Sequence, residues 1–247
     1  MDKTKIKIVH IINDLSPGGA EKMLLNLVSN TDKSKFDIYV LSLQDKGEVA
    51  FDIEKNGVPV FCFHIFKKYD FIFKFLKLLF TLVKINPNIV HTWMYHSNLI
   101  GGVAAKLATC SKIMWSIHST TLDPGPKKFS TKIVIKLSKI FSKIIPDNII
   151  LCSKASYQFH KSIGYKKNSM DIIPNGIDLK RFKYSTNGKL NLINKLKIDP
   201  ESKFIGMVGR YHSMKRHDIF LHAAKIIINK YPSIHFILCG TGVDDSN

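Results

Sequence analysis

Short apolar runs alternate along the chain with longer stretches in which apolar residues recur every three or four positions. Alternation of this kind is typical of a parallel sheet with helices on both faces. With right-handed crossovers between the strands, it predicts an α/β fold, a doubly wound, Rossmann-like parallel sheet. We expect the strands at residues 6–12, 36–43, 58–63, 88–91, 112–118, 148–152 and 169–173.

Helices are predicted between these strands, where the apolar period lengthens from two residues to about 3.6. We expect them from Ala20 onward and at residues 52–56, 71–85, 98–108, 129–145 and 153–162. Together the strands and helices define a first domain over residues 1–178.

The same alternation begins again after a more polar stretch that contains Pro200. We interpret residues 179–201 as a linker region and residues 202–247 as the start of a second domain. Its expected elements are strands at 204–208 and 235–239 and a helix at 217–230. Two strands and one helix do not close a sheet, because the strand edges stay unpaired. The second Rossmann-like domain is therefore expected to be incomplete.

Two glycines, Gly18 and Gly19, lie in the loop after the first strand, directly before a predicted helix. Glycine lets the backbone approach a ligand closely, and the N-terminus of a helix attracts phosphate. The spacing does not match G-x-G-x-x-G, so the dinucleotide-binding fingerprint is absent. A phosphate-binding loop and a plain tight turn both fit this segment.

Several cations follow the strand at 204–208, among them Arg210 and Lys215. Arginine offers a planar fork to phosphate oxygens, and lysine offers a mobile point charge. A diphosphate is a natural ligand for such a loop, and a solvated basic loop is the alternative.

Two histidines, His91 and His118, end predicted strands of one sheet. Ligands of doubly wound sheets bind beyond the carboxyl ends of the strands, so both are candidates for a functional role. A structural or solvated role is the alternative for each. Residues 172–178 follow another strand with Pro174, Asn175 and Gly176, which alone predicts only a turn.

The charge of the chain is strongly positive: 37 Lys and Arg stand against 19 Asp and Glu, a net charge of +18 over 247 residues. Nucleic acid, anionic lipid headgroups and phosphate-bearing substrates all suit such a charge. Because no nucleic-acid-binding module is recognisable, we expect no nucleic-acid partner. The four cysteines form no C-x-x-C pair and no metal cluster stands out. Without a visible signal peptide, free thiols and a cytoplasmic location are expected.

A row of lysines with helical spacing lies opposite an apolar stripe, with no acidic residue between Lys127 and Lys143. This pattern resembles a basic amphipathic helix lying on an anionic membrane, at the inner face of the plasma membrane. An outer helix of the sheet with a solvated lysine face is the alternative. The Phe- and Leu-rich stretch from Lys67 to Lys84 favours the membrane. The lysines of the row are Lys128, Lys132, Lys136, Lys139 and Lys143.

Taken together, the order and spacing of these motifs resemble the GT-B glycosyltransferases, specifically the retaining group called family 4 or glycosyl transferases group 1. The resemblance covers nearly the whole chain. The residues that carry it are Gly18-Gly19-Ala20-Glu21, Val90-His91-Thr92-Trp93, Ser116-Ile117-His118, Pro174-Asn175-Gly176-Ile177-Asp178, Val208-Gly209-Arg210 with Lys215, and Gly240-Thr241-Gly242.

The resemblance implies two Rossmann-like domains, the first for the acceptor and the second for the nucleotide sugar. It implies that Arg210 and Lys215 bind the donor diphosphate and that the Gly18-Gly19 loop approaches the same phosphate. It also implies a catalytic position for His118, in contact with the donor sugar near the reacting carbon. The cations would stabilise the leaving diphosphate without a metal or other cofactor.

The implied reaction is hexosyl transfer with retention from a UDP- or GDP-sugar to a glycan or lipid-linked acceptor, in surface polysaccharide or lipopolysaccharide biosynthesis. Family members carry a paired-glutamate element further into the second domain, and the sequence ends before it. The chain as given is therefore expected to be a fragment with little activity. A non-catalytic glycosyltransferase-like binding module and a GT-B sugar-nucleotide epimerase stay open as alternatives.

Overall fold

The computed structural model describes residues 5–66, 70–108, 111–120, 129–165, 169–180 and 182–243. They form two compact units, which divide between Gly176 and Ile177. The first unit contains a seven-stranded sheet and the second a two-stranded sheet.

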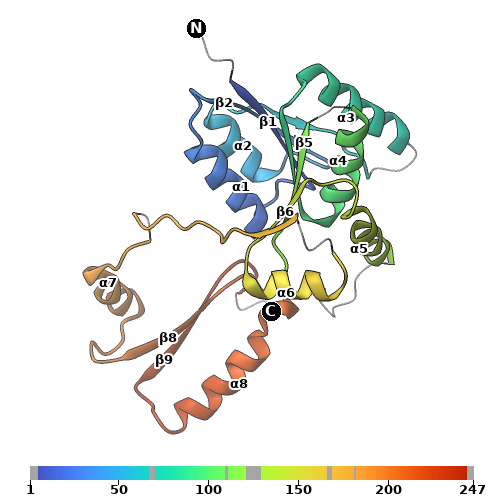
Figure 1. Ribbon diagram of the computed structural model, residues 1–247. Coiled ribbons are helices and arrows are strands. Elements are labelled where there is room, and N and C mark those ends of the chain that lie inside the picture. The colour runs from blue at the N-terminus through green and yellow to red at the C-terminus, as the bar shows by residue number, and fades with distance from the viewer. Residues whose placement is uncertain are drawn as a thin grey trace. The chain divides into compact units, whose positions relative to one another are not determined.

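The sheet of the first unit is parallel throughout, with the strand order β3-β2-β1-β4-β5-β6-β7 (Figure 1). The strand order reverses direction between β1 and β4, as in a doubly wound sheet. The predicted α/β fold class is therefore confirmed. The strands are β1 (Ile6–Ile12), β2 (Phe36–Ser42), β3 (Val60–Cys62), β4 (Ile89–Trp93), β5 (Lys112–Ile117), β6 (Asn148–Leu151) and β7 (Met170–Ile172).

Helices cover both faces of this sheet, because neighbouring residues of each strand point to opposite sides. Ile11 of β1 belongs to the core cluster under α3 (Phe71–Ile85), α4 (Met94–Ala108) and α5 (Phe129–Phe141). Ile12 belongs to the cluster under α1 (Gly19–Asn30) and α2 (Gly47–Lys55). The last helix of the unit, α6 (Lys154–Ser162), contacts β6 and β7.

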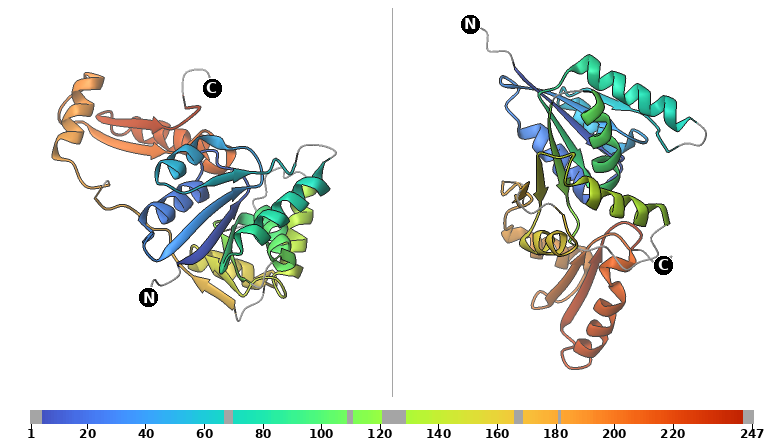
Figure 2. Two further views of the ribbon diagram at one scale, coloured as in Figure 1. Left: turned by 90° about the horizontal axis from the view of Figure 1, so that it is seen from above. Right: turned by 45° about the vertical axis from the view of Figure 1, so that its right-hand side comes forward.

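The helices α3, α4 and α5 form one layer, in which α4 contacts both of the others. In Figure 2 they stay together as the teal, green and yellow-green helices on one side of the sheet. Two glycines allow α4 to approach the strands closely. A Cβ at Gly101 would lie 2.9 Å from Cγ2 of Ile11, and one at Gly102 would lie 2.8 Å from Nε1 of Trp115.

Two helices of the first unit begin earlier than the sequence predicts. α2 starts at Gly47 rather than Asp52, because Val49, Ala50 and Ile53 together form its buried face. α4 starts at Met94 rather than Asn98, and the polar side chains of its first turn, Ser97 and Asn98, are buried. In both cases polar or glycine residues near the helix start interrupt the recurrence of apolar residues from which a helix is predicted.

The second unit consists of α7 (Thr186–Leu196), the parallel pair β8 (Lys203–Val208) and β9 (Ile234–Cys239), and α8 (His217–Ile228) between these strands. A short 3-10 helix, η2 (Ser213–Lys215), lies in the loop between β8 and α8. The expected strand, helix and strand of this region are thus present. α7 occupies the stretch interpreted as a linker, and it buries Ile193.

No helix among the described residues is long and apolar enough to cross a bilayer. The three cysteines that lie within the described ranges, Cys62, Cys152 and Cys239, are free thiols.

Candidate functional site

The carboxyl ends of β1, β4 and β5 bring four ring side chains together, which we call the aromatic cluster: His10, His91, Trp93 and His118. The register of the parallel strands places His10 beside His91 and Trp93 beside Ser116. His118 follows Ser116 by two positions and therefore points to the same face of the sheet. The cluster arises from the strand period of two in three adjacent strands.

Trp93 lies at the centre of the aromatic cluster and is itself only 3% exposed. Its ring stacks on the ring of His118 with centroids 5.1 Å apart and an interplanar angle of 9°. Its centroid also lies 4.7 Å from that of His91. Nε1 of Trp93 donates a hydrogen bond to Nδ1 of His10, at 3.3 Å. Trp93 therefore orients the predicted catalytic residue and ties it to the core of the sheet.

Burial favours the neutral form of the two inner histidines. It lowers the pKa of His10 from 6.5 to about 4. Burial also lowers the pKa of His91 well below 6.5, and the neighbouring His10 and His118 add to this effect. Nε2 of His91 lies 2.7 Å from Oγ of Ser116 in a hydrogen bond. His91 is thus part of the core, and its predicted place at the end of a strand is wrong, because β4 continues to Trp93.

His118 keeps part of its ring accessible and joins two segments that the sequence analysis singled out separately. Its Nδ1 donates a hydrogen bond to Oδ1 of Asn175, at 3.1 Å, since an amide oxygen can only accept. In neutral His118, Nε2 is then the acceptor. Burial lowers the pKa of His118, and the hydrogen bond to Asn175 opposes this shift. A neutral ring in this orientation can accept a hydrogen bond from a ligand hydroxyl.

Gly18 and Gly19 lie at the start of α1, beyond the carboxyl end of β1. Gly18 is the N-cap, and no side chain caps the helix there. The side of Gly19 on which a Cβ would lie is open, with no atom within 4 Å of that position. A Cβ at Gly18 would lie 2.2 Å from Oε2 of Glu21, whose carboxylate therefore lies beside the helix start. Packing in the first unit does not require glycine at position 19.

Arg210 and Lys215 lie in the loop that leaves the carboxyl end of β8 in the second unit. Both side chains are exposed, and neither forms an ion pair with a residue in the described part of the chain. The Lys215 stem lies over Gly209, where a Cβ would come 3.6 Å from Cδ of the lysine. Arg216 differs, because its Nη2 pairs with Oδ2 of Asp218 at 2.8 Å. The loop thus offers two cations that have no acidic partner among the described residues.

The loop after β9 lies directly against this basic loop. The backbone N–H of Gly209 donates to the carbonyl of Cys239, and that of Tyr211 donates to the carbonyl of Thr241, both at 2.8 Å. A Cβ at Gly240 would lie 2.0 Å from the carbonyl oxygen of Gly209. Only glycine permits this approach, so the Gly240-Thr241-Gly242 segment helps to shape the loop that carries Arg210.

The predicted site residues thus fall into two groups. Gly18, Gly19 and His118 belong to the first unit, and Arg210 and Lys215 belong to the second. The ring contacts of His10 and Trp93 were not predicted from the sequence, although the strand spacing of two links His10 to Ile12 and His91 to Trp93. Within the described ranges, no group of three His, Cys, Asp or Glu residues could hold a metal ion.

Comparisons with known sequences point to one family. A sequence model of Glycosyltransferase Family 4 matches residues 17–181, well over half of the chain. The chain is 27% identical over 249 residues to the UDP-Gal:alpha-D-GlcNAc-diphosphoundecaprenol alpha-1,3-galactosyltransferase of Escherichia coli, covering 97% of this chain and 63% of that protein. It is 26% identical over 229 residues to the capsular polysaccharide biosynthesis glycosyltransferase CapH of Staphylococcus aureus, covering 92% and 59%. The chain spans less than two thirds of the length of these two relatives.

Solved structures share the fold. The crystal structure of HepE from Anabaena in complex with UDP-glucose matches with a TM-score of 0.78 at 19% identity, over 94% of this chain and 60% of that chain. At this level of identity the likeness concerns the fold alone. It agrees with the GT-B architecture expected from the sequence, which is thereby confirmed.

Proposed function

The chain belongs to glycosyltransferase family 4, and from this premise we propose that the whole protein transfers a hexosyl group from a nucleotide-sugar donor to a glycan or lipid-linked acceptor. We propose that the transferred sugar keeps its anomeric configuration. The process we propose is the synthesis of a surface polysaccharide or lipopolysaccharide.

The names of these relatives support the donor and the acceptor class. The Escherichia coli relative is named for UDP-galactose and a diphosphoundecaprenol-linked acceptor. The Staphylococcus aureus relative is named for capsular polysaccharide, and the Anabaena protein was solved with UDP-glucose. We therefore favour a UDP-sugar over a GDP-sugar as the donor, and a glycan on a polyprenyl diphosphate as the acceptor.

The observation that carries the proposal is the pair of cations, Arg210 and Lys215, in the glycine-lined loop at the carboxyl end of β8. When the bond between the sugar and the nucleotide breaks, negative charge builds up on the leaving diphosphate. Two cations already in place stabilise this charge more in the transition state than in the bound donor. Arginine can bind two phosphate oxygens at once, and lysine supplies a further point charge.

His118 is proposed to contact the donor sugar. Its lowered pKa keeps the ring neutral at neutral pH, and the hydrogen bond to Asn175 leaves Nε2 as the acceptor. Nε2 would then accept a hydrogen bond from a sugar hydroxyl near the reacting carbon. The stacked Trp93 holds the ring in this orientation. The backbone at Gly19, on the open side of the α1 start, is proposed as a second contact of the diphosphate.

The location proposed for the protein is the cytoplasmic face of the membrane, reached through α5. Lys132, Lys136 and Lys139 are exposed on this helix and Lys143 is exposed two residues beyond its end, whereas Lys128 lies outside the described residues. The apolar stripe predicted beside these lysines is largely exposed. Ile133, Leu137, Ile140 and Ile144 are 42%, 36%, 52% and 64% exposed, whereas its fifth member, Phe141, packs against the core together with Val134 and Ile135. The helix thus has a buried apolar face, as an outer helix of the sheet does, and an exposed apolar face in addition.

The proposal is tested by measuring binding of UDP, GDP and their sugar conjugates to the 247-residue chain by thermal shift and calorimetry. We expect selective stabilisation by one nucleotide. R210Q and K215Q should each weaken binding by about tenfold or more, since each removes a charge-assisted contact of about 1.5–3 kcal/mol. R216Q is the matched control and should bind as the parent does, because the Arg216 guanidinium already pairs with Asp218. Equal losses in R210Q and R216Q, or no binding of any nucleotide by the parent, would count against the proposal.

The role of Gly19 has its own test. G19A meets no atom within 4 Å and should leave the melting temperature unchanged or slightly raised, because alanine favours the helix. If the backbone at position 19 touches the diphosphate, the added methyl group should lower nucleotide affinity several-fold. G188A, in the first turn of α7, is the matched control and should bind normally. Unchanged nucleotide affinity in G19A would exclude the proposed contact.

A further inference from the structure

The helix α3 has three faces, only one of which packs on the sheet. Leu78 and Leu82 are fully buried, and Phe75 is packed against the same core cluster. A second face carries exposed apolar side chains, which we call the α3 apolar stripe. Its members are Ile72, Phe73, Leu76, Phe80 and Val83, at 70%, 76%, 40%, 65% and 49% exposure.

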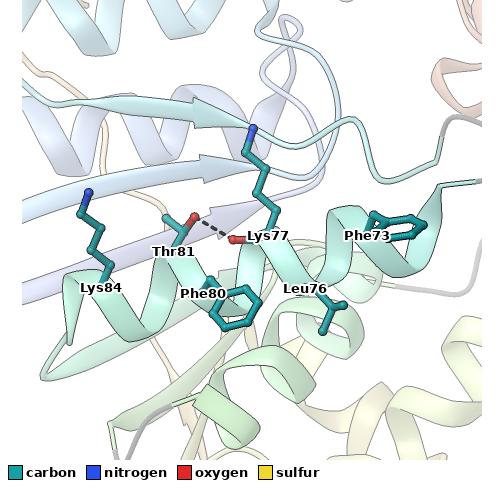
Figure 3. A pocket seen from close by; sticks show the side chains of 6 residues that line it. All are labelled: Phe73, Leu76, Lys77, Phe80, Thr81 and Lys84. Carbon is teal, nitrogen blue, oxygen red and sulfur yellow. Dashed lines mark hydrogen bonds between the residues drawn. The ribbon is translucent and has the colours of Figure 1, made fainter.

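The third face is basic and lies beside the α3 apolar stripe. Exposed Lys77 and Lys84 project from one side of the helix, whereas Leu76 and Phe80 project from the other (Figure 3). Together with Phe73 and Thr81 these four residues line a shallow hollow along α3. No acidic residue occurs from Phe71 to Ile85, and Lys74, nearer the helix start, pairs with Asp70 at 2.7 Å.

The α3 apolar stripe is too large to be an incidental exposure. Single apolar residues on a surface are ordinary, but contiguous apolar patches rimmed by polar residues mark interaction sites. Five large side chains in one stripe over about four turns of helix form such a patch. Most of the surface of Ile72, Phe73 and Phe80 is left uncovered by the first unit, so a partner that covers it would explain the apolar character of the stripe.

We propose that the α3 apolar stripe inserts into the interface of an anionic lipid bilayer, with Lys77 and Lys84 on the headgroups. Exposed phenylalanine and isoleucine with adjacent lysines form the side-chain pattern of helices that lie in the membrane plane. α5, in the same helix layer, carries the exposed isoleucines and lysines described above, so both helices present apolar side chains with cations. This inference deepens the membrane part of the proposed function and rests on it.

Charge argues against a second copy of the chain as the partner. Each copy carries a net charge of +18, and two stripes in contact would bring two sets of lysines close together. An anionic surface turns the same lysines into favourable contacts. The lysine spacing on α3 thus selects lipid headgroups rather than another copy.

The test is co-sedimentation of the 247-residue chain with vesicles of phosphatidylglycerol and phosphatidylcholine, and with vesicles of phosphatidylcholine alone. We expect binding to the anionic vesicles. F73Q/F80Q should lower the partition coefficient by about tenfold or more, because the apolar area that enters the lipid is lost. K77Q/K84Q should weaken binding to the anionic vesicles and make it less sensitive to salt.

Two matched variants control for general effects. F51Q removes a phenylalanine on α2 that is 55% exposed, and K189Q/K195Q removes two exposed lysines of α7. Both should bind vesicles as the parent does. Circular dichroism should show that each variant is folded, because the replaced side chains are exposed.

The proposal is overturned if F73Q/F80Q binds vesicles like the parent, if the parent binds neutral and anionic vesicles equally, or if it binds neither. Concentration-dependent self-association that F73Q/F80Q abolishes would assign the stripe to a second copy instead. Nucleotide binding, measured on the same preparations, separates the two proposals. Normal UDP binding without vesicle binding refutes only the membrane surface, and the reverse result refutes only the donor site.

Discussion

At the residue scale, the pKa of His118 is set by two neighbours with opposite effects. The stacked Trp93 covers its ring, and burial lowers the pKa, whereas the hydrogen bond to Asn175 raises it. W93L should therefore move the pKa of His118 up toward 6.5, and N175A should move it further down. Titration of the histidine ring protons by NMR measures both shifts.

A general loosening of the fold would move the pKa of His118 toward 6.5 in both variants. Shifts of opposite sign would therefore exclude this explanation. W93L leaves a cavity in a buried position, with an expected cost of about 2–4 kcal/mol, so its fold needs checking by circular dichroism. N175A changes an exposed residue and should be nearly neutral for stability. Shifts of the same sign in both variants would show that these two contacts do not set the pKa of His118.

At the scale of the elements, the sequence predicts helices and strands best where the apolar residues follow a single pattern. The buried run of β1 and the helix α3 have the bounds that were predicted from it. The early starts of α2 and α4 were not predictable, because Gly47 and the Met94–Ser97 turn lack an apolar repeat. The Phe- and Leu-rich composition of α3 favoured a membrane contact, but it could not show which of its apolar side chains are exposed, because the helix is apolar around most of its surface. The stacking of Trp93 on His118 depends on β4 lying between β1 and β5, which chain order alone does not determine.

The close contact of α4 with the sheet depends on Gly102. A Cβ at this position would lie 2.8 Å from Nε1 of Trp115 and 3.0 Å from Cγ2 of Ile145, two buried side chains. Because neither can move without disturbing the core, G102A should destabilise the first unit by about 1–3 kcal/mol, despite the better helix propensity of alanine. Urea unfolding followed by tryptophan fluorescence measures this. G19A, which meets open space, is the control, and equal stability of the two variants would contradict the packing argument.

At the scale of the whole molecule, the residues that we propose as donor contacts occur in both units. Gly19 and His118 belong to the first unit, and Arg210 and Lys215 belong to the second. In each sheet they lie in loops that follow the carboxyl ends of parallel strands. The motifs could be predicted from the sequence because they lie in these loops. The protonation states of the histidines could not be predicted, since they depend on the burial that strand pairing creates.

The buried histidines make the stability of the first unit depend on pH. The pKa of His10 is lowered from 6.5 to about 4 and that of His91 is lowered as well, so the unfolded chain binds more protons between these pH values. The stabilisation from their neutral forms is complete above about pH 6.5 and is lost as the pH falls toward 4. For His10 the loss amounts to about 3 kcal/mol at most.

Tryptophan fluorescence reports this loss for the first unit alone, because Trp93 and Trp115 are the two tryptophans of the chain. Urea unfolding at about pH 7 and about pH 5 should show a clear fall in the free energy of unfolding. H10N keeps an acceptor for Nε1 of Trp93 but no longer titrates, so its fall should be smaller. H222N, at an exposed position on α8, should behave like the parent. If H10N loses as much stability as the parent does, protonation of His10 is not the source of the acid sensitivity.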